Sequence, residues 1–389
     1  MKKNLLIAFV FISVTLRAFA DPLPPATGQD IVLRVLISDD KECVYLALKH
    51  PYTIYAMNID KVLIKGGWLS TKIIAVKDGL EVDKRFFKTE GIRVKVEGAS
   101  SAIYVGGRKF RGEVDIVRKD NGKLMVINHI DLEEYLYGVL YHEVSHRWPM
   151  EVLKAQAIAA RTFALYQARQ NKLQPYDLRS DIYSQVYGGS GSEKWSTTMA
   201  VNRTKGKVLT YNADLLPAYY HATCAGSTED AASLWNVDIP PLKTVACDFC
   251  KESPHYSWSK EIPLWTIETK LRDGGYKIGK ISSFSILSRN KSGRVDKLEI
   301  KDTDCTSVIM TGKDFRQMMG PNELRSTRFD ACVRWSSLAV EGKGWGHGVG
   351  MCQWGAFGQA RAGKKCEEIL DWYYHGTEIT TIDKLVRKI

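Results

Sequence analysis

The most regular hydrophobic pattern in this 389-residue chain begins just after residue 130. Asp131 and Glu134 form a capping-box pattern, with Asp in place of Ser or Thr, so we expect a helix to begin at Leu132. The apolar residues that follow are spaced three or four positions apart and predict one buried face of that helix. They are Leu132, Tyr135, Leu136, Val139 and Leu140.

Glu143 extends this apolar face. It lies four residues after Val139 and seven after Leu136, which places it on the same side of the helix. A carboxylate in that position is poorly solvated, and desolvation disfavours its charged form. We therefore expect the pKa of Glu143 to rise towards the range that suits a general acid. The alternative is a solvated glutamate at a helix end, which is the usual state of this residue type.

A second helix is predicted from Pro149, because a first helical residue tolerates proline: its missing N–H would have had no partner there anyway. Helix-forming residues continue as far as Gln170. Small side chains at helical spacing form a strip along this helix, against which another backbone or a ligand can approach closely. The strip consists of Ala157, Ala160, Ala164 and Ala168.

The rest of the chain predicts an α+β protein. Residues 31–126 contain short β-branched and aromatic runs separated by turns, as in an all-β unit. We place the boundary of this β-rich N-terminal domain at residues 21–127, and a mixed helix and strand domain at 128–389. Within the second domain we expect a turn-rich loop that leads into a helix, a β-hairpin and several further helices. These segments are the loop at 178–191, the hairpin turn at 290–293, and helices near 264–271, 312–319, 353–362 and 367–374.

Residues 1–20 are predicted to be a secretory signal peptide. Two lysines precede an apolar run from Leu5 to Leu16, and Ala18-Phe19-Ala20 offers a small-residue cleavage site. The run is short for a membrane span, but Arg17 near the cleavage site keeps an uncleaved membrane anchor as the alternative. We therefore predict export to the periplasm or another extracytoplasmic part of the envelope, with membrane attachment only if the segment is retained.

The net charge of +11 falls to +8 when cleavage removes the three cations of this segment. A basic exported protein suits an anionic wall or outer surface. No basic cluster interleaved with aromatic residues stands out, so we do not predict nucleic acid as a partner.

The cysteines of the middle region are spaced like zinc ligands. Cys247 and Cys250 form a CxxC pair, with Cys224 upstream and His255 downstream. Thiolates and imidazole complete a tetrahedral site. We predict these four residues as the ligands of a structural zinc, which leaves His221 free. Disulfides are the equal alternative, because an exported compartment permits them. Among the other cysteines, Cys305 could pair with Cys332 and Cys352 with Cys366. If three cysteines bind zinc, Cys43 then has no partner.

Three blocks of the chain resemble the stage II sporulation protein D family, which includes lytic transglycosylases of the bacterial cell wall and amidase enhancers. They are LEEYLYGVLYHEVSHRWPMEVLKAQAIAARTFAL (132–165), YYHATCAGSTEDAASLWN (219–236) and GKGWGHGVGMCQWGAFGQARAGKKCEEILDWYYHGTEI (342–379). The first block aligns Glu143 with the catalytic glutamate of the family. Some clostridial relatives hold zinc in the segment that follows, but this chain has no Cys or His between Asn171 and Tyr220.

The resemblance implies a groove that binds the glycan strands of peptidoglycan. Glu143 would protonate the oxygen between N-acetylmuramic acid and N-acetylglucosamine, and would then help the muramic C6 hydroxyl to attack C1 and close an anhydro ring. One carboxyl is enough, whereas glycoside hydrolases normally need two. No cofactor is required for this chemistry. Aromatic faces, including Trp354, would pack against sugar rings. The predicted substrate-binding residues are Arg161, Tyr219, Tyr220, His221, Trp345, His347 and Gln353.

His347 lies among alternating glycines, Gly344 to Gly350, that let the backbone turn tightly near a ligand. It is predicted to contact sugar or to hydrogen-bond Glu143, with a merely packed histidine as the alternative. Two other functions are also open. The protein could bind peptidoglycan and activate a cell-wall amidase without cleaving anything, or it could itself be a zinc amidase that uses His221, His255 and a carboxylate around an open metal.

Overall fold

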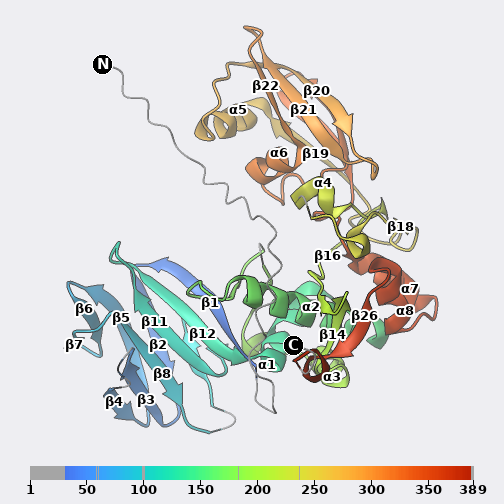
Figure 1. Ribbon diagram of the computed structural model, residues 1–389. Helices are drawn as coiled ribbons and strands as arrows, with labels where there is room; N and C mark the ends of the chain where they lie inside the picture. The colour runs from blue at the N-terminus through green and yellow to red at the C-terminus, as the bar shows by residue number, and fades with distance from the viewer. Residues whose placement is uncertain are drawn as a thin grey trace.

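The computed structural model describes residues 31–57, 59, 61–98, 101–182, 184–235 and 237–386. The predicted signal peptide lies outside them. Figure 1 shows three parts: a blue-to-teal unit of strands, a central group of helices that the red C-terminal segment rejoins, and an orange unit of strands and helices. The mixed class predicted from sequence is confirmed.

The N-terminal unit is built from strands only, as predicted. Its described residues form a seven-stranded sheet in the order β13-β1-β12-β11-β8-β3-β4, where β13 is Leu178–Arg179, and a six-stranded sheet in the order β10-β9-β2-β5-β6-β7. Alternate side chains such as Val114 and Ile116 point into the core between them and are fully buried. The strands are β1 Val32–Lys41, β2 Cys43–Leu48, β3 Tyr52–Ala56, β4 Val62–Gly66, β5 Leu69–Val76, β6 Gly79–Val82, β7 Arg85–Phe87, β8 Gly91–Val96, β9 Ile103–Val105, β10 Arg108–Phe110, β11 Glu113–Arg118 and β12 Leu124–Asp131.

Strand β12 runs through the position of the predicted domain boundary and leads directly into helix α1, Leu132–Glu143. The Asp131 carboxylate accepts hydrogen bonds from the backbone N–H groups of Glu133 and Glu134, at 2.8 and 3.1 Å. The predicted helix start is therefore confirmed. Because β13, Leu178–Arg179, pairs in parallel with β1, the sheet and the helices share one hydrophobic core.

Helix α2, Met150–Gln170, crosses the centre of the molecule. Pro149 caps it rather than forming its first turn, one residue from the prediction. The predicted strip of small residues is packed, with Ala157, Ala160 and Ala164 fully buried. Around it lie η1 Ser190–Ser192, α3 Trp195–Arg203, β14 Lys207–Tyr211, β15 Asp214–Leu215, α7 Gln353–Arg361, α8 Cys366–Tyr373, β26 Glu378–Thr381 and α9 Ile382–Val386.

The orange unit in Figure 1 has a hydrophobic core of its own, formed by residues between 258 and 340. The predicted helices and hairpin of this stretch are present. Its elements are β19 Ser257–Pro263, α5 Leu264–Asp273, β20 Ile281–Arg289, β21 Val295–Asp302, β22 Ser307–Thr311, α6 Gly312–Met319, β23 Phe329–Arg334 and β24 Ser337–Lys343.

Short elements join this unit to the centre: β16 Tyr220–His221, β17 Gly226–Ser227, α4 Ala231–Trp235, η2 Pro240–Leu242, β18 Ala246–Cys247 and β25 Met351–Cys352. Strands β16 and β25 pair in parallel, with His221 opposite Cys352. This pairing brings the middle and C-terminal sequence blocks together beside α1 and α2. None of the helices in the described part of the chain has the length and hydropathy needed to span a bilayer.

Candidate active site

A groove of about 920 Å³ lies where the three family-like blocks meet. Its walls come from the end of α1, the segment before α2, strand β16, helix α4, the glycine-rich loop before β25 and the start of α7. Helix α6 of the orange unit and the loop after it close one side. The side chains that matter for the chemistry below are Glu143, Trp148, Asp181, Tyr219, Tyr220, His221, Trp235, Trp345, His347, Gln353 and Trp354.

Glu143 is the last residue of α1, and it is half-buried in the groove wall. Burial raises the pKa of its carboxyl to about 7. The side chains of Gln353 and Tyr220 and the backbone N–H of Val186 donate hydrogen bonds to it, and these lower the pKa only in part. All three donors are neutral. The raised pKa predicted from the apolar pattern is thus confirmed, and the group holds its proton for about half the time near pH 7.

Tyr220 is held in place by a buried network that reaches back to α1. The Gln185 amide donates to the Tyr220 hydroxyl at 2.9 Å, and its carbonyl oxygen accepts from the Tyr135 hydroxyl at 3.0 Å. The same amide donates to the Ala160 carbonyl at 3.2 Å. Because the hydroxyl of Tyr220 already accepts a hydrogen bond from Gln185, its own proton is free to point at Glu143.

Gln353 reaches Glu143 from the opposite wall. It is the first residue of α7 and is 95% buried. Its amide also donates to the Gln156 carbonyl oxygen on α2, at 3.4 Å. We predicted that Gln353 binds substrate; it lines the groove, and its side chain donates to the carboxyl of Glu143.

Two of the histidines that line the groove, His221 and His347, are neutral. Burial lowers the pKa of His347 to about 3 and lowers that of His221 well below its usual value, helped by the neighbouring His347 and Arg294. His347 accepts from the Val349 N–H at 3.1 Å and donates to the Tyr220 carbonyl, so both its ring nitrogens are engaged by backbone. The predicted bond from His347 to Glu143 is therefore replaced by bonds from Gln353 and Tyr220.

His221 has spare hydrogen-bonding capacity. Its Nδ1 lies 3.1 Å from the Val349 carbonyl, which fixes the proton on that nitrogen. Within the described residues, its buried Nε2 has no partner. A lone pair beside the groove can accept a hydroxyl or amide proton from a ligand.

Aromatic rings line much of the groove, as predicted for Tyr219, Trp345 and Trp354. Tyr219 stacks at 4.5 Å on Trp235, a residue in the middle block that the sequence analysis did not single out. Trp148, which was also missed, packs edge-on against Trp354 at 5.1 Å. Its position just before the proline that caps α2 is the only signal that pointed to it.

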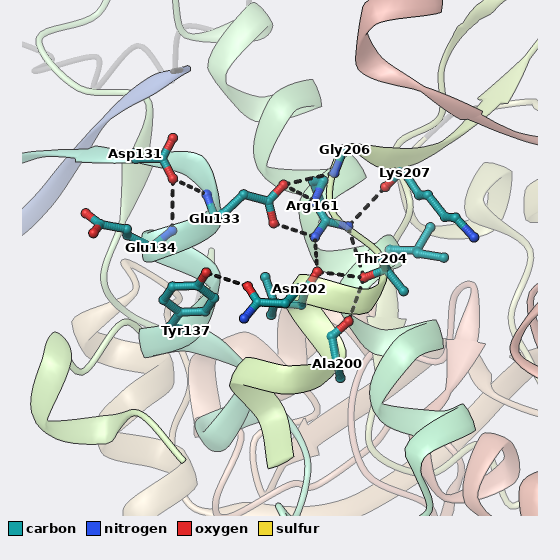
Figure 2. A network of polar contacts seen from close by, with 12 residues as sticks. Asp131, Glu133, Glu134, Tyr137, Arg161, Ala200, Asn202, Thr204, Gly206 and Lys207 are labelled. Carbon is teal, nitrogen blue, oxygen red and sulfur yellow. Dashed lines mark hydrogen bonds and ion pairs between the residues drawn. The ribbon is translucent and has the colours of Figure 1, made fainter. Parts of the chain in front are cut away.

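Arg161 does not reach the groove, and its predicted role in substrate binding was wrong. Figure 2 shows its guanidinium enclosed between α1 and α3. It is fully buried and forms two bonds with Glu133, at 2.6 and 2.8 Å. Its remaining N–H groups donate to the carbonyls of Val201 and Lys207. The role of Arg161 is therefore structural.

A second carboxylate lines the groove, at Asp181 in the loop after β13. Arg179 pairs with it at 2.8 Å, and about a third of its side chain is exposed. Among the described residues, the hydrogen bonds to Glu143 come from neutral groups. The two acids are therefore suited to different tasks, with Glu143 the better proton donor.

Three of the four predicted zinc ligands come together, but the fourth does not. The sulfurs of Cys224, Cys247 and Cys250 cluster with that of Cys352, all within 4.8 Å of one another. His255 instead packs edge-on against Trp345 at 4.4 Å between ring centres, so its predicted ligand role was wrong. The pairing of Cys352 with Cys366 is absent too: all eight cysteines lie in described residues, and each is unbridged.

Comparison with known proteins was made on sequence. Residues 120–211 match the family model described as stage II sporulation protein, and residues 243–350 match a domain of unknown function (DUF8618). An uncharacterised protein of Brachyspira hyodysenteriae is 32% identical over 91% of this chain and 94% of its own length.

Two relatives carry functional names. The stage II sporulation protein D of Bacillus subtilis is 32% identical, over 67% of this chain and 78% of its own length. The amidase enhancer of the same organism is 28% identical over 82% of this chain, but the match spans 51% of the enhancer. The extent of these matches shows that the chain belongs to the stage II sporulation protein D family.

Proposed function

We propose that this protein is an exported lytic transglycosylase that cuts the glycan strands of peptidoglycan between N-acetylmuramic acid and N-acetylglucosamine. The observation that carries the proposal is Glu143: a carboxyl with a pKa of about 7 in the wall of a groove lined with aromatic rings. The names of the sporulation and amidase-enhancer relatives support a place in the cell envelope.

The reaction needs one proton donor that becomes a proton acceptor. Protonated Glu143 gives its proton to the bridging oxygen, and the bond from that oxygen to C1 of the muramic sugar breaks. The C6 hydroxyl of the same sugar then bonds to C1, and its proton returns to the Glu143 carboxylate. Atoms balance without water, so the product is an anhydro ring. A pKa near working pH favours both transfers.

The remaining groups of the groove have roles in holding the substrate. Tyr219, Trp235 and Trp345 offer flat apolar faces on which sugar rings pack. His221 offers an acceptor at Nε2 for a hydroxyl or N-acetyl amide proton. Tyr220 and Gln353 position the carboxyl of Glu143 and stabilise its charged form after the first proton transfer.

The test is to incubate the mature protein with purified peptidoglycan, intact and amidase-treated, and to identify the products by mass spectrometry. We expect anhydromuramic ends from the wild type and at least about 10³-fold less product from Glu143→Gln, in line with the loss of a general acid. The matched control is Asp181→Asn, which should retain anhydro products. Reducing-end products that disappear in both variants would contradict the proposal, because they would identify a hydrolase with two carboxylates.

The second candidate is a protein that binds peptidoglycan and activates a cell-wall amidase without cleaving glycan. The observation in its favour is the match to the Bacillus subtilis amidase enhancer along 82% of this chain. The two candidates differ in the same experiment. If folded wild-type protein binds glycan and releases no fragment, but accelerates a purified amidase, this second function replaces the first.

A zinc amidase is not supported by the placement of its ligands. It needs His221, His255 and a carboxylate around one metal with an open position. In the described part of the chain, the group of side chains able to hold a metal is instead made of four buried cysteines.

A further inference from the structure

Four cysteines from three separate parts of the sequence meet behind the groove. Cys224 follows β16, Cys247 and Cys250 form the CxxC loop at β18, and Cys352 ends β25. All four side chains are fully buried, and their sulfurs lie within 4.8 Å of one another. Four buried thiols that lie this close together without disulfide bonds indicate a ligand that binds all four sulfurs.

The sulfur positions suit a metal better than disulfides. The sulfurs of Cys224 and Cys250 are 3.6 Å apart, whereas a disulfide bond is about 2.05 Å long. Four thiolates about 2.3 Å from a central zinc form a tetrahedron whose edges are about 3.8 Å. The observed spacing is close to that edge.

Hydrogen-bond donors surround the sulfurs. The backbone N–H groups of Cys224 and Gly355 point at the sulfur of Cys352, at 3.2 and 3.3 Å. The N–H of Ala225 points at Cys250, and the Tyr373 hydroxyl lies 3.2 Å from the sulfur of Cys247. Such outer contacts are typical of metal sites, because they orient the ligands and offset part of the thiolate charge.

Helix α7 is shaped to approach the CxxC loop closely. A Cβ on Gly355 would lie 2.6 Å from the sulfur of Cys247, and one on Gly358 would collide with the carbonyl of Phe249. Real Cβ atoms do not come so close, so larger residues at either position would push the helix away from the cysteines. The absence of a side chain at Gly355 and Gly358 thus lets α7 pack against the cysteine loop, a requirement that does not come from the groove.

We propose that Cys224, Cys247, Cys250 and Cys352 bind one zinc ion. A buried tetrahedral set of four cysteines is characteristic of structural zinc and leaves no position for a substrate or water. The ion ties the segment after β16, the CxxC loop and the start of α7 into one unit. The fourth ligand is thus a cysteine of the C-terminal block, in place of His255.

The position of the ion links it to the groove. Cys352 directly precedes Gln353, which donates to Glu143, and it pairs across the parallel strands with His221. Zinc therefore positions one wall of the groove from behind without touching the substrate. This inference stands whether the groove cleaves glycan or only binds it.

The first measurement is the metal content of the full-length mature protein, purified without added metal or reductant. We expect one zinc per chain, and release of that zinc by a chelator after the thiols are modified. Denaturing mass spectrometry should then find the four cluster cysteines alkylated rather than bridged. Substoichiometric zinc, bound iron, or two disulfides among these four cysteines would each overturn the proposal.

Variants then identify the ligands. Cys352→Ser should lower the zinc content at least tenfold under dialysis, while His255→Ala should keep one zinc per chain. Cys366→Ser is the matched control, because Cys366 is equally buried but lies outside the cluster. Zinc lost in His255→Ala and kept in Cys352→Ser would restore the other ligand set and refute ours. If Cys352→Ser does not fold, the metal content and alkylation of the wild type still decide the question.

Discussion

Helix α1 carries one buried glutamate, Glu133, and one half-buried glutamate, Glu143, and their surroundings differ. Glu133 stands in the first turn of the helix and Glu143 at its last residue. The partial positive charge at a helix N-terminus favours a carboxylate, and the partial negative charge at the C-terminus disfavours one. The helix dipole alone therefore gives the two carboxyls different electrostatic environments.

Their partners increase the difference. Glu133 faces the guanidinium of Arg161 with two short bonds and also accepts from the Gly206 N–H at 3.1 Å, as Figure 2 shows. Glu143 receives bonds from an amide, a phenol and a backbone N–H, none of which carries a charge. Glu133 thus has a charged partner, whereas the neutral donors around Glu143 leave that carboxyl able to exchange a proton. One glutamate thereby fastens helices together and the other is available for acid–base chemistry.

The largest effect is expected from breaking the buried pair. Arg161→Met leaves Glu133 as an uncompensated charge, and we expect the free energy of unfolding to fall by about 3–5 kcal/mol in urea titrations. The double variant Glu133→Leu/Arg161→Met should recover much of that loss. Arg169→Met is the surface control: its partner Asp214 is largely exposed, and the expected change is below about 1 kcal/mol. A weakened substrate affinity at unchanged stability would instead restore Arg161 as a binding residue.

The same substitution at the two glutamates should change stability with opposite signs. Glu143 has a folded pKa of about 7, above its ordinary value of 4.5. Between these values the unfolded state loses its proton first as the pH rises, so stability falls across that window and the full cost is present above pH 7. Glu143→Gln should therefore raise the free energy of unfolding at pH 8 by roughly 1–3 kcal/mol, and by little at pH 4.5.

Glu133→Gln is the matched variant and should lower stability at pH 8, because it removes the charge that satisfies Arg161. Both comparisons use denaturant unfolding at pH 4.5 and pH 8. A loss of stability in Glu143→Gln at pH 8 would show that its carboxylate is better satisfied than the neutral donors suggest.

The raised pKa of Glu143 could be predicted from the sequence because its signal is local. The apolar period of 132–143 and the cap at Asp131 place the carboxyl on a buried face, and both features depend on neighbouring residues only. Arg161 lies on an equally regular helix, but what it contacts depends on α1 and α3 packing around it. A buried arginine and a groove arginine look alike in sequence.

The cysteine cluster shows the same limit at longer range. The CxxC spacing of Cys247 and Cys250 indicates a metal site in the sequence. Cys352 lies more than a hundred residues away and joins them only because β25 pairs with β16. His255 is near in sequence, yet the chain carries it to Trp345. The backbone N–H of Val186 that contacts Glu143 has no sequence signal at all.

The pH profile tests the proton-holding role of Glu143 directly. If its protonated form starts the reaction, kcat/KM should be level below about pH 7 and fall tenfold for each pH unit above it. At low pH we expect activity to be limited by unfolding. The pKa values of His221 and His347 are lowered in the folded state, so the stability that these two groups contribute is lost as the pH falls below about 6.5. A profile that rises above pH 7 would instead show that the carboxylate form starts the reaction.

The smallest effect should come from removing one neutral donor. Tyr220→Phe deletes a hydrogen bond that favours the charged form of Glu143, so its pKa should rise and the falling limb of the profile should move up by about 0.5–1 pH unit. Tyr137→Phe is the matched control, because Tyr137 lies on the same helix as Glu143 but its hydroxyl donates to Asn202. The control should leave the limb in place. A limb that stays fixed in Tyr220→Phe would mean that another group titrates in the reaction, and the contrast between the two glutamates would then concern packing alone.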